Sequence, residues 1–380
     1  MKLGVGIIGY GFIGRVHALS YLSLPFYYKP LPVEVELIGV ATAHKETAQE
    51  GIREAGFKFA TDDFNELLER KDIHVIHCCT PNHLHREILI RAMRAGKHIY
   101  CDKPLCMSLS EAREILSEAE KHPDGKYQMG FEYRFIPALM RAKGLIDEGR
   151  LGDVFHFRAQ YLHSGYIDPE RPMSWRLDKR LAGGGALFDL GSHVIDLVRF
   201  LLGEIGSVSA VCETFIKERP IRKGSEERVK VEVDDLCIAQ VSLERGGFGV
   251  IEASRVATGS NDDLRFEIHG TRGALRFDLM EPNWLYFYDL ERPGEPIGGE
   301  RGFIKIETVQ RYPEPARFPG PKFGIGWMRY SMASIFEFLR CIAEDRDPLP
   351  SFEDGAKAQA VIDAAYLSAK EGRWVEVEEV

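Results

Sequence analysis

Asp189 and His193 have the side chains and the spacing needed to remove a proton from a hydroxyl group. They are four residues apart in GGGALFDLGSHVID (183–196), so both would lie on one face of a helix. A histidine with a carboxylate partner can accept the proton of an alcohol that is being oxidised. Gly183–Gly185 would let a ligand approach the backbone at the start of this helix. The alternative is an ordinary polar pair on an exposed helix.

Lys103 is a second residue that could act on the same hydroxyl. It stands in CDKPL (101–105), where Pro104 favours an extended backbone at the preceding residue, and Asp102 lies beside it. A lysine ammonium near a nicotinamide could hydrogen-bond a substrate hydroxyl and stabilise negative charge on its oxygen. The alternative is a Lys–Pro turn at the surface.

The amino terminus carries a glycine motif for a dinucleotide. Gly9, Gly11 and Gly14 in GYGFIG follow the apolar run VGII and precede a helix-like segment. In this pattern the first glycine allows the turn, the second lets a pyrophosphate approach, and the third lets helix pack on strand. We expect a bound dinucleotide here, with Phe12 and Ile13 also contacting it.

The residues that end the next strand bear on the choice of cofactor. An acid normally binds the ribose 2′-hydroxyl of NAD, but no Asp or Glu lies between residues 37 and 45. Thr42 takes the corresponding position, and His44 and Lys45 follow. A hydroxyl and a cation would accept a 2′-phosphate, which favours NADP slightly over NAD. The alternative is that His44 and Lys45 only form a solvated helix start.

The segments that must position these residues alternate in type over the first third of the chain. Strand–helix alternation predicts a parallel, doubly wound sheet. The expected strands cover residues 3–9, 33–41, 73–80, 98–104 and 127–135. The expected helices cover residues 12–24 (ended by Pro25), 45–56, 64–71, 83–96 and 108–122, the last with a Ser cap.

Beyond residue 150 the pattern changes to strands joined by short turns, which predicts a large and mainly antiparallel sheet. The expected strands cover residues 153–163, 238–244, 247–257, 264–270, 274–280 and 284–290, with one helix, 186–202, among them. An ordered loop (312–327) and two helices (328–345 and 354–372) close the chain. The fold class is α/β, with a Rossmann domain over 1–130 and an α+β domain over 131–380.

Composition narrows the class of protein. The chain has 380 residues and is 44% hydrophobic and 28% charged, which is typical of globular proteins. A formal net charge of −9 argues against nucleic acid and anionic membrane as partners, and no apolar run is long enough to span a membrane. Seven cysteines without a CxxC pair favour neither a disulfide framework nor a zinc site, so we expect no metal. The start MKLGVGIIGYG lacks a signal-peptide layout, and we expect a cytoplasmic protein.

The order of the motifs resembles the glucose–fructose oxidoreductase / inositol dehydrogenase / rhizopine-catabolism (Gfo/Idh/MocA) family over essentially the whole chain. Where the family more often has Glu-Lys-Pro, this sequence has Asp102 before Lys103. The motifs that carry the resemblance are GYGFIG with His17 and Ala18, TPNHLH (80–85), CDKP (101–104), GFEYRF (130–135), SWR (174–176), the 183–196 segment, GTRG (270–273) and the segment 354–373.

The resemblance implies roles for individual residues. Lys103, Asp189 and His193 would be catalytic, with His193 as the general base, Asp189 assisting it and Lys103 orienting the hydroxyl. The residues implied for cofactor binding, besides those of the glycine motif and of the second strand, are Thr80, Pro81, Asn82, His85, Asp102, Lys103, Arg134, Trp175 and Arg176. The residues implied for substrate binding are Lys103, Tyr133, Tyr161, His163, Asp189 and His193.

The family implies an NAD(P)-dependent dehydrogenase of a sugar, a cyclitol or a related polyol, which forms homodimers or homotetramers through the open face of its large sheet. Tyr161, Tyr166 and Trp327 could stack on a sugar ring or belong to the core. Two other functions stay open: a glycosidase that works by transient oxidation of its substrate, and a non-catalytic sensor of dinucleotide. The presence of Lys103, Asp189 and His193 argues against the sensor.

Overall fold

The computed structural model describes residues 1–380, which form two compact units. One unit contains residues 1–135 and 312–359 together with Val380, and the other contains residues 136–311 and 360–379. The domain boundary after residue 130 stays a prediction. The grouping of residues 312–359 with the amino-terminal unit is a feature that the sequence did not indicate.

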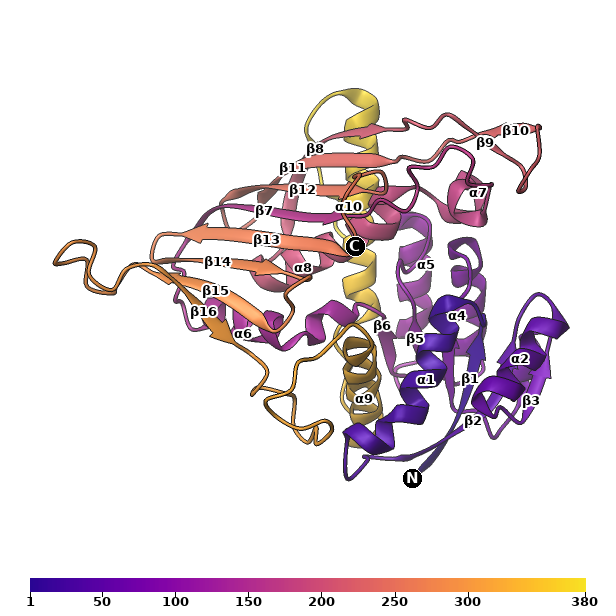
Figure 1. Ribbon diagram of the computed structural model, residues 1–380. Helices are drawn as coiled ribbons and strands as arrows, with labels where there is room; N and C mark the ends of the chain where they lie inside the picture. Colours follow the sequence, from indigo (N-terminus) through magenta and orange to yellow (C-terminus); the bar gives the residue numbers. More distant parts are fainter. The chain divides into compact units, whose positions relative to one another are not determined.

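The first unit is built on a six-stranded parallel sheet, which Figure 1 shows in indigo to magenta. Its strand order is β3-β2-β1-β4-β5-β6, and every neighbouring pair runs parallel. This is the order of a dinucleotide-binding fold, in which the order reverses between β1 and β4 and ligands bind outside the carboxyl ends of the strands. The strands are β1 (Lys2–Ile8), β2 (Glu34–Ala41), β3 (Phe59–Thr61), β4 (Val75–Cys78), β5 (His98–Cys101) and β6 (Tyr127–Met129).

The helices of this unit follow the predicted alternation. They are α1 (Phe12–Tyr27), α2 (Lys45–Ala55), α3 (Asn65–Glu69), α4 (His85–Arg94), α5 (Leu109–Glu120), α9 (Met328–Glu344) and the first part of α10 (Phe352–Glu371), with the 3-10 turns η1 (Asn82–Leu84) and η2 (Glu132–Phe135). Gly56 ends α2 in the left-handed conformation, and the Ser108 side chain caps α5 as expected.

Two local predictions were wrong. Pro25 does not end α1 but lies inside its last turn. A proline removes one backbone donor, and this loss is tolerated there because Tyr28 N–H still bonds to the Leu24 oxygen. The segment 127–135 is a strand only as far as Met129, and its second part is the 3-10 turn η2.

The second unit is built on a nine-stranded sheet of order β16-β15-β14-β13-β7-β12-β11-β8-β17. The pair β7 and β12 runs parallel and the other pairs run antiparallel, so the sheet is mixed. The strands are β7 (Val154–Leu162), β8 (Ile205–Glu213), β11 (Leu236–Leu243), β12 (Phe248–Ser254), β13 (Asp263–Gly270), β14 (Gly273–Asp278), β15 (Trp284–Asp289), β16 (Phe303–Glu307) and β17 (Val375–Glu376), with a separate hairpin of β9 (Glu218–Pro220) and β10 (Arg228–Lys230).

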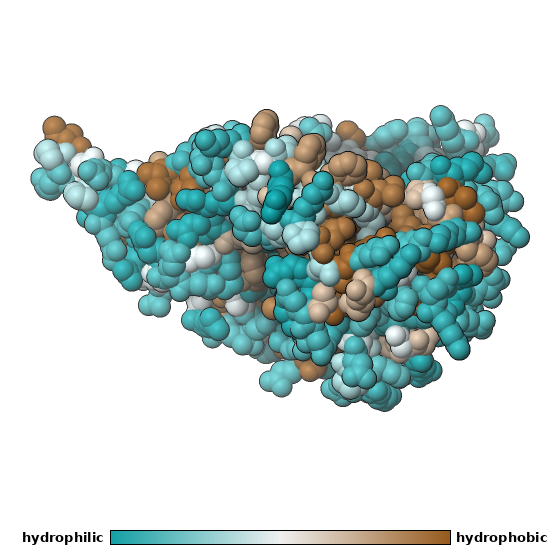
Figure 2. Space-filling model, turned by 90° about the horizontal axis from the view of Figure 1, so that it is seen from below, coloured by the Kyte–Doolittle hydropathy of each residue, from teal (hydrophilic) through white to brown (hydrophobic).

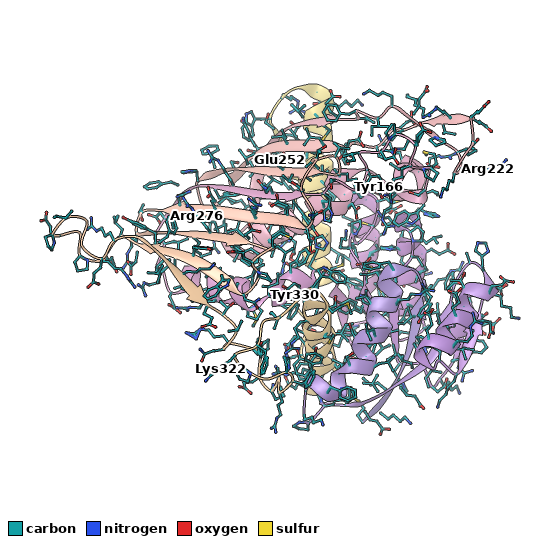
Figure 3. All side chains as sticks on the ribbon, viewed as in Figure 1. Tyr166, Arg222, Glu252, Arg276, Lys322 and Tyr330 are labelled. Atoms are coloured by element: carbon teal, nitrogen blue, oxygen red, sulfur yellow. The ribbon has the colours of Figure 1, made fainter.

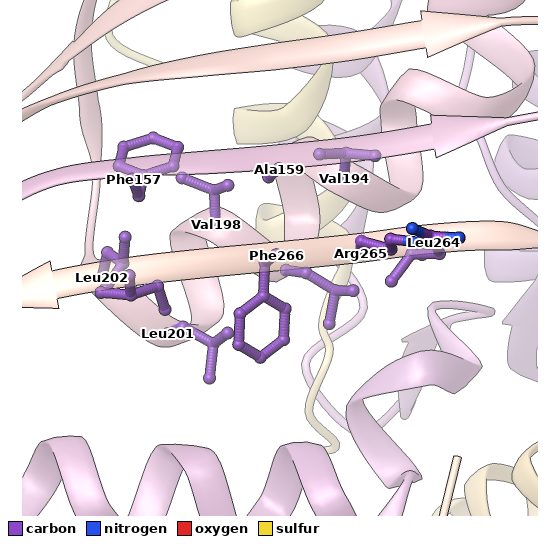
Figure 4. Close-up of a pocket in the computed structure, with 11 residues that line it drawn as sticks. Phe157, Ala159, Val194, Val198, Leu201, Leu202, Leu264, Arg265 and Phe266 are labelled. Carbon is purple, nitrogen blue, oxygen red and sulfur yellow. The ribbon is translucent and has the colours of Figure 1, made fainter. Parts of the chain in front are cut away.

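Asp189 and His193 lie in two consecutive helical segments of this unit, and an apolar face of the second one packs on the sheet. Figure 4 shows Val194, Val198 and Leu201 against Phe157 of β7 and Phe266 of β13, around a cavity of about 10 Å³. Packing this close fixes the rotation of the helix. The helical segments of the unit are α6 (Pro137–Asp147), η3 (Trp175–Leu177), α7 (Lys179–Ala182), the π-helical turn η4 (Leu187–Gly191), α8 (Ser192–Leu202) and the end of α10.

The loop between β15 and β16 projects from the nine-stranded sheet (Figure 1, orange). Figure 2 shows hydrophobic atoms at the tip of a projecting segment, and Ile297, which lies in the loop between β15 and β16, is fully exposed. No helix of the chain is both long and apolar enough to cross a bilayer.

Candidate active site

The three glycines of the loop after β1 meet the three requirements of a dinucleotide motif. Gly9 has a φ of +94°, and a Cβ on it would lie 2.4 Å from the Cys79 backbone oxygen. A Cβ on Gly14 would lie 2.0 Å from the Gly9 oxygen, so α1 can pack this close to β1 only without a side chain. A Cβ on Gly11 would meet nothing within 4 Å. Gly11 is therefore the glycine that leaves open space for a pyrophosphate.

The start of α1 can hold that pyrophosphate. No side chain caps the helix at Gly11, so its first N–H groups are available to an anion. Phe12 is 72% exposed and stacks on Trp327, with 5.7 Å between the ring centroids. Trp327 Nε1 donates to the Tyr133 hydroxyl at 3.3 Å. The two aromatic rings form a wall beside the glycine loop, a contact of Trp327 that the sequence did not reveal.

The end of β2 has the polar character predicted from the sequence. Thr42 is the first residue after β2, and its hydroxyl donates to the His44 backbone oxygen at 2.6 Å. His44 is the N-cap residue of α2, and Lys45 begins the helix. A phosphate here would meet a hydroxyl, a helix N-terminus and an ammonium instead of a carboxylate.

His85, which the resemblance assigned to cofactor binding, is completely buried. Its Nδ1 lies 2.9 Å from the Pro104 backbone oxygen and its Nε2 lies 3.0 Å from the Thr80 backbone oxygen. Two carbonyl acceptors favour an imidazolium that donates to both. Burial opposes this charge, but Cys78 and the two carbonyls outweigh burial and raise the pKa of His85. We interpret His85 as the residue that ties the Thr80 segment to the Lys103–Pro104 turn.

The same buried region holds three possible metal ligands. Cys78 and Cys101 are register partners on β4 and β5, and their sulfurs and the His85 ring lie within 4.8 Å of one another. Burial opposes ionisation of Cys78, yet its hydrogen bonds to Cys101 and Thr80 and the charge of His85 lower its pKa to about 6. An ion would have to displace a carbonyl from His85, because both ring nitrogens already have one. The absence of a metal centre stays a prediction, and all seven cysteines are free thiols.

Lys103 lies where the sequence predicted, just beyond the carboxyl end of β5. The parallel ladder continues past the strand, because Asp102 N–H donates to the Cys78 oxygen at 2.9 Å. Asp102 and Lys103 are both partly exposed. The Lys103 backbone is therefore held by the sheet on one side and by His85 on the other, while its side chain stays accessible.

Arg134 and Tyr133, in η2, are buried and anchored within the first unit. Arg134 Nη2 donates to Asp354 Oδ1 at 2.9 Å, and the Tyr133 ring lies 6.3 Å from that of Tyr330. An ion pair with Asp354 indicates that Arg134 stabilises the turn, and its predicted contact with the cofactor stays a prediction.

In the second unit, Asp234 fixes the start of the helix that carries Asp189. Its two oxygens accept the N–H groups of Gly185 at 2.7 Å and Leu187 at 2.8 Å, and the Tyr366 hydroxyl also donates to it. A Cβ on Gly185 would lie 1.8 Å from the backbone oxygen of Asp234. The expectation that Gly183–Gly185 admit a ligand was therefore wrong, because Asp234, Tyr366 and neighbouring rings fill that space.

The exposed-helix alternative for Asp189 and His193 was also wrong. His193 is 5% and Asp196 1% exposed, and every residue from Ser192 to Arg199 is buried. Asp189 lies in the π-helical turn η4, a widened turn that often marks a functional site. Its side chain is 27% exposed and forms an ion pair with Arg255 at 3.1 Å.

Polar groups at the end of β7 and just before β13 lie beside His193. The Tyr161 ring packs edge to face on the His193 ring, with 5.8 Å between centroids. The Tyr161 hydroxyl donates to Asp262 Oδ1 at 2.6 Å, and His163 Nε2 lies 3.4 Å from the same oxygen. Asp262, which the sequence did not indicate, joins the two predicted substrate residues.

Trp175 and Arg176 form the turn η3 in the same unit. The Arg176 guanidinium lies 4.4 Å from the centre of the Trp175 ring, and its backbone oxygen accepts from Arg255. Tyr166 lies beyond the end of β7 (Figure 3), where the guanidinium of Arg171 is 4.2 Å from its ring centre. Tyr166 therefore packs on cations, as does Trp175.

Comparison with known proteins decides the family. Residues 3–131 match the family model "Oxidoreductase family, NAD-binding Rossmann fold", and residues 143–377 match "Oxidoreductase family, C-terminal alpha/beta domain". This chain belongs to the Gfo/Idh/MocA family. It is a nicotinamide-dependent oxidoreductase, and the predicted family and fold are confirmed.

Several Gfo/Idh/MocA proteins match over the whole chain. Levoglucosan dehydrogenase of Pseudarthrobacter phenanthrenivorans is 36% identical over 391 residues, which cover 100% of this chain and 99% of that protein. Inositol 2-dehydrogenase of Rhizobium meliloti is 29% identical over 381 residues, which cover 99% of this chain and 100% of that protein. A structure of levoglucosan dehydrogenase in complex with NADH and levoglucosan matches with a TM-score of 0.94 at 36% identity, covering 100% of both chains.

Proposed function

We propose that this Gfo/Idh/MocA protein is an NAD(P)-dependent dehydrogenase that oxidises a hydroxyl group of a sugar, a cyclitol or a related polyol. The observation that carries the proposal is the buried helix on which Asp189, tied to Arg255, stands one turn before His193. Relatives that match the full chain are named for the oxidation of levoglucosan and of inositol. Levoglucosan is therefore the first substrate to test.

In this mechanism His193 accepts the proton of the substrate hydroxyl, and the Asp189 carboxylate stabilises the imidazolium that forms. Lys103 donates a hydrogen bond to the hydroxyl oxygen and stabilises the charge that develops there. A bound nicotinamide supplies an acceptor for the hydride that leaves the substrate carbon. Tyr161, His163 and Asp262 supply polar atoms for other hydroxyl groups of the ring.

For the cofactor, we propose that the chain accepts both nicotinamides and prefers NADP. The support is the hydroxyl of Thr42 and the ammonium of Lys45 at the start of α2, with no carboxylate between residues 37 and 45. A comparison of kcat/KM for NAD and for NADP tests this preference. A value several times higher for NAD would contradict it.

The test of the function is a panel of sugars and cyclitols, beginning with levoglucosan and inositols, with formation of reduced cofactor as the signal. His193→Ala should lower kcat by about 10²–10⁴, the usual contribution of a general base. Lys103→Ala should abolish turnover and still bind cofactor, and Lys71→Ala, an exposed lysine of the same unit, serves as its control.

Two results would contradict this function. Normal turnover in Lys103→Ala would exclude the mechanism. If no compound of the panel gives reduced cofactor while cofactor is found bound to the purified protein, the glycosidase or the sensor is favoured. Cleavage of glycosides would then be tested.

We also propose that the protein works in the cytoplasm and forms homodimers or homotetramers. Seven free thiols suit a reducing compartment, and cell fractionation tests the location. The oligomer would form through the open face of the nine-stranded sheet.

A further inference from the structure

Arg255 is a buried cation outside the residues that sequence or resemblance assigned to the site. It follows β12 directly, and its side chain is only 3% exposed. Its backbone N–H donates to the Asp235 oxygen at 2.9 Å, and its backbone oxygen accepts from Tyr166 N–H at 3.1 Å. A guanidinium buried this deeply needs a partner of opposite charge.

Its guanidinium connects two segments that carry predicted site residues. Nη2 donates to Asp189 Oδ2 at 3.1 Å, and Nη1 donates to the Arg176 backbone oxygen at 3.2 Å. The centre of the guanidinium lies 4.9 Å from the centroid of the Tyr166 ring, whose face attracts a cation. A flat, forked cation reaches the two acceptors from two separate nitrogens in a fixed geometry, whereas an ammonium would have to reach both from one nitrogen.

We propose that Arg255 is a positioning residue of the active site, which holds the Asp189 carboxylate in place and compensates its charge so that His193 stays neutral and able to accept a proton. The inference rests on the proposed function, because it takes His193 as the base. Burial opposes the charge on Arg255, but Asp189 outweighs burial and raises the pKa of the arginine. Arg255 therefore stays charged throughout the working range of pH.

The electrostatics follow from the charges around the helix. The other titratable groups near Asp189 and His193 are Tyr161, His163, Asp262, Asp234, Tyr366 and, on the helix itself, Asp196. Five of these groups are acids or phenols and one is a histidine, so Arg255 supplies the positive charge. Without it, the surrounding carboxylates would favour a protonated His193.

The experiment compares three variants of the full-length protein. Arg255→Gln removes the charge, and Arg255→Lys keeps the charge but has a single donor group. Arg219→Gln is the matched control. Arg219 is equally buried and lies 5.9 Å from the centroid of the same Tyr166 ring, but its donors reach the backbone oxygens of Tyr166 and Asp168.

The first measurement follows protonation directly. The His193 imidazole is titrated by NMR in each variant, with its signal assigned by its absence in His193→Gln. Arg255→Gln should raise the titration midpoint by about one pH unit, the usual effect of one adjacent charge. Arg255→Lys and Arg219→Gln should leave the midpoint within about 0.3 units of the wild type on the same charge argument.

The second measurement is the pH profile of kcat/KM. In Arg255→Gln the acidic limb should move upward by the same interval, which lowers kcat/KM by about tenfold at pH values below both midpoints. In Arg255→Lys the pH profile should keep its midpoint while kcat falls at least tenfold. The reason is that no guanidinium then bonds both the Asp189 carboxylate and the Arg176 backbone oxygen of η3. The dissociation constant of the cofactor and the far-UV circular dichroism should stay unchanged in both.

An unmoved midpoint in a folded Arg255→Gln protein would overturn the inference, as would an equal upward shift in Arg219→Gln. Should Arg255→Gln not fold, full kcat in Arg255→Lys would overturn it instead. The NMR titration needs no turnover. A wild-type protein that is inactive on every substrate would therefore remove the proposed function while the titration still decides the role of Arg255.

Discussion

Thr42 is a single side chain whose replacement should change cofactor preference. Its hydroxyl stands at the end of β2, where a carboxylate would bind a ribose 2′-hydroxyl and repel a 2′-phosphate. Thr42→Asp should therefore lower the ratio of kcat/KM for NADP to that for NAD by at least tenfold, about 1.4 kcal/mol of discrimination. Steady-state kinetics with both cofactors measure the ratio.

The control is Thr47→Asp, because Thr47 lies in α2, the helix that follows Thr42. Thr61 is less suitable for a control, because it is buried. Thr47 lies outside the strand end, so Thr47→Asp should leave the ratio close to that of the wild type. An unchanged ratio in Thr42→Asp would mean that Thr42 does not face the ribose.

Single residues also explain where reasoning from the sequence reached its limit. The spacing of Asp189 and His193 was enough to place them on one helix face, but not to show that the helix is buried. The partner of Asp189, Arg255, is 66 positions away, and Asp234, which caps the helix, lies 49 positions from Gly185. No local pattern encodes such a contact, because it depends on which strand ends meet in the folded sheet.

At the scale of elements, α1 and β4 share a buried pair of histidines. His17 Nδ1 lies 3.0 Å from His77 Nδ1, and His77 Nε2 lies 2.7 Å from the Tyr21 hydroxyl. One consistent assignment has Tyr21 donating to His77 and His77 donating to His17. Burial lowers the pKa of His17 to about 3 and that of His77 well below its usual value. Both rings are therefore neutral in the folded protein.

This pair predicts a loss of stability in mild acid. The folded pKa values lie below the unfolded value of about 6.5, so unfolding takes up protons as the pH falls below that value. The stabilisation is complete above about pH 6.5 and is lost toward pH 3 at about 1.4 kcal/mol per pH unit for each histidine. Urea unfolding between pH 7.5 and pH 5 measures the slope of the free energy of unfolding.

His17→Gln should remove one of the two contributions and reduce the slope by about 1.4 kcal/mol per pH unit. Tyr21→Phe is the matched control, because it removes a hydrogen bond of the same network without removing a histidine. It should lower stability by about 1–3 kcal/mol at every pH and leave the slope unchanged. Equal slopes in the wild type and in His17→Gln would refute this interpretation.

Element boundaries show why periodicity predicts some features and not others. Leu190, Val194, Leu197 and Leu201 recur in the sequence at helical spacing, which predicts one apolar face, and all four residues are buried. The π-helical turn at Leu187–Gly191 was missed, because one extra residue in a turn leaves no mark in a short pattern. The parallel pairing of β7 with β12 was missed as well, since it joins strands that are distant in the sequence.

For the whole molecule, the order of the motifs carried more information than any one of them. The glycine motif, CDKP and the Asp–His helix each had a plausible alternative. Together they indicated one family, and the models of both domains of that family match the chain. The sequence could not indicate that residues 312–359 group with the amino-terminal unit, because the Pro- and Gly-rich segment 312–327 marks a break in the pattern without showing against which unit the following helix packs.

The open face of the nine-stranded sheet is where the chain should meet a second copy of itself. Phe248 of β12 is 62% exposed, Val211 of β8 is 64% exposed, and Ile238 of β11 is 41% exposed. All three alternate with side chains that are buried on the opposite face. Glu252 and Arg276 lie among the strands of this sheet in Figure 3. Apolar side chains interspersed with charges are typical of an interface between subunits.

Phe248→Asp should therefore convert a dimer or tetramer into smaller species in sedimentation velocity, because two carboxylates would be buried at each symmetric contact. Phe155→Asp is the matched control. Phe155 is also 62% exposed, but along β7 it alternates with His156 and shares the side of buried Phe157, which faces α8. It should leave the sedimentation coefficient unchanged. A wild-type protein that sediments as a monomer would contradict the proposed oligomer, and an effect of Phe155→Asp alone would place the interface elsewhere.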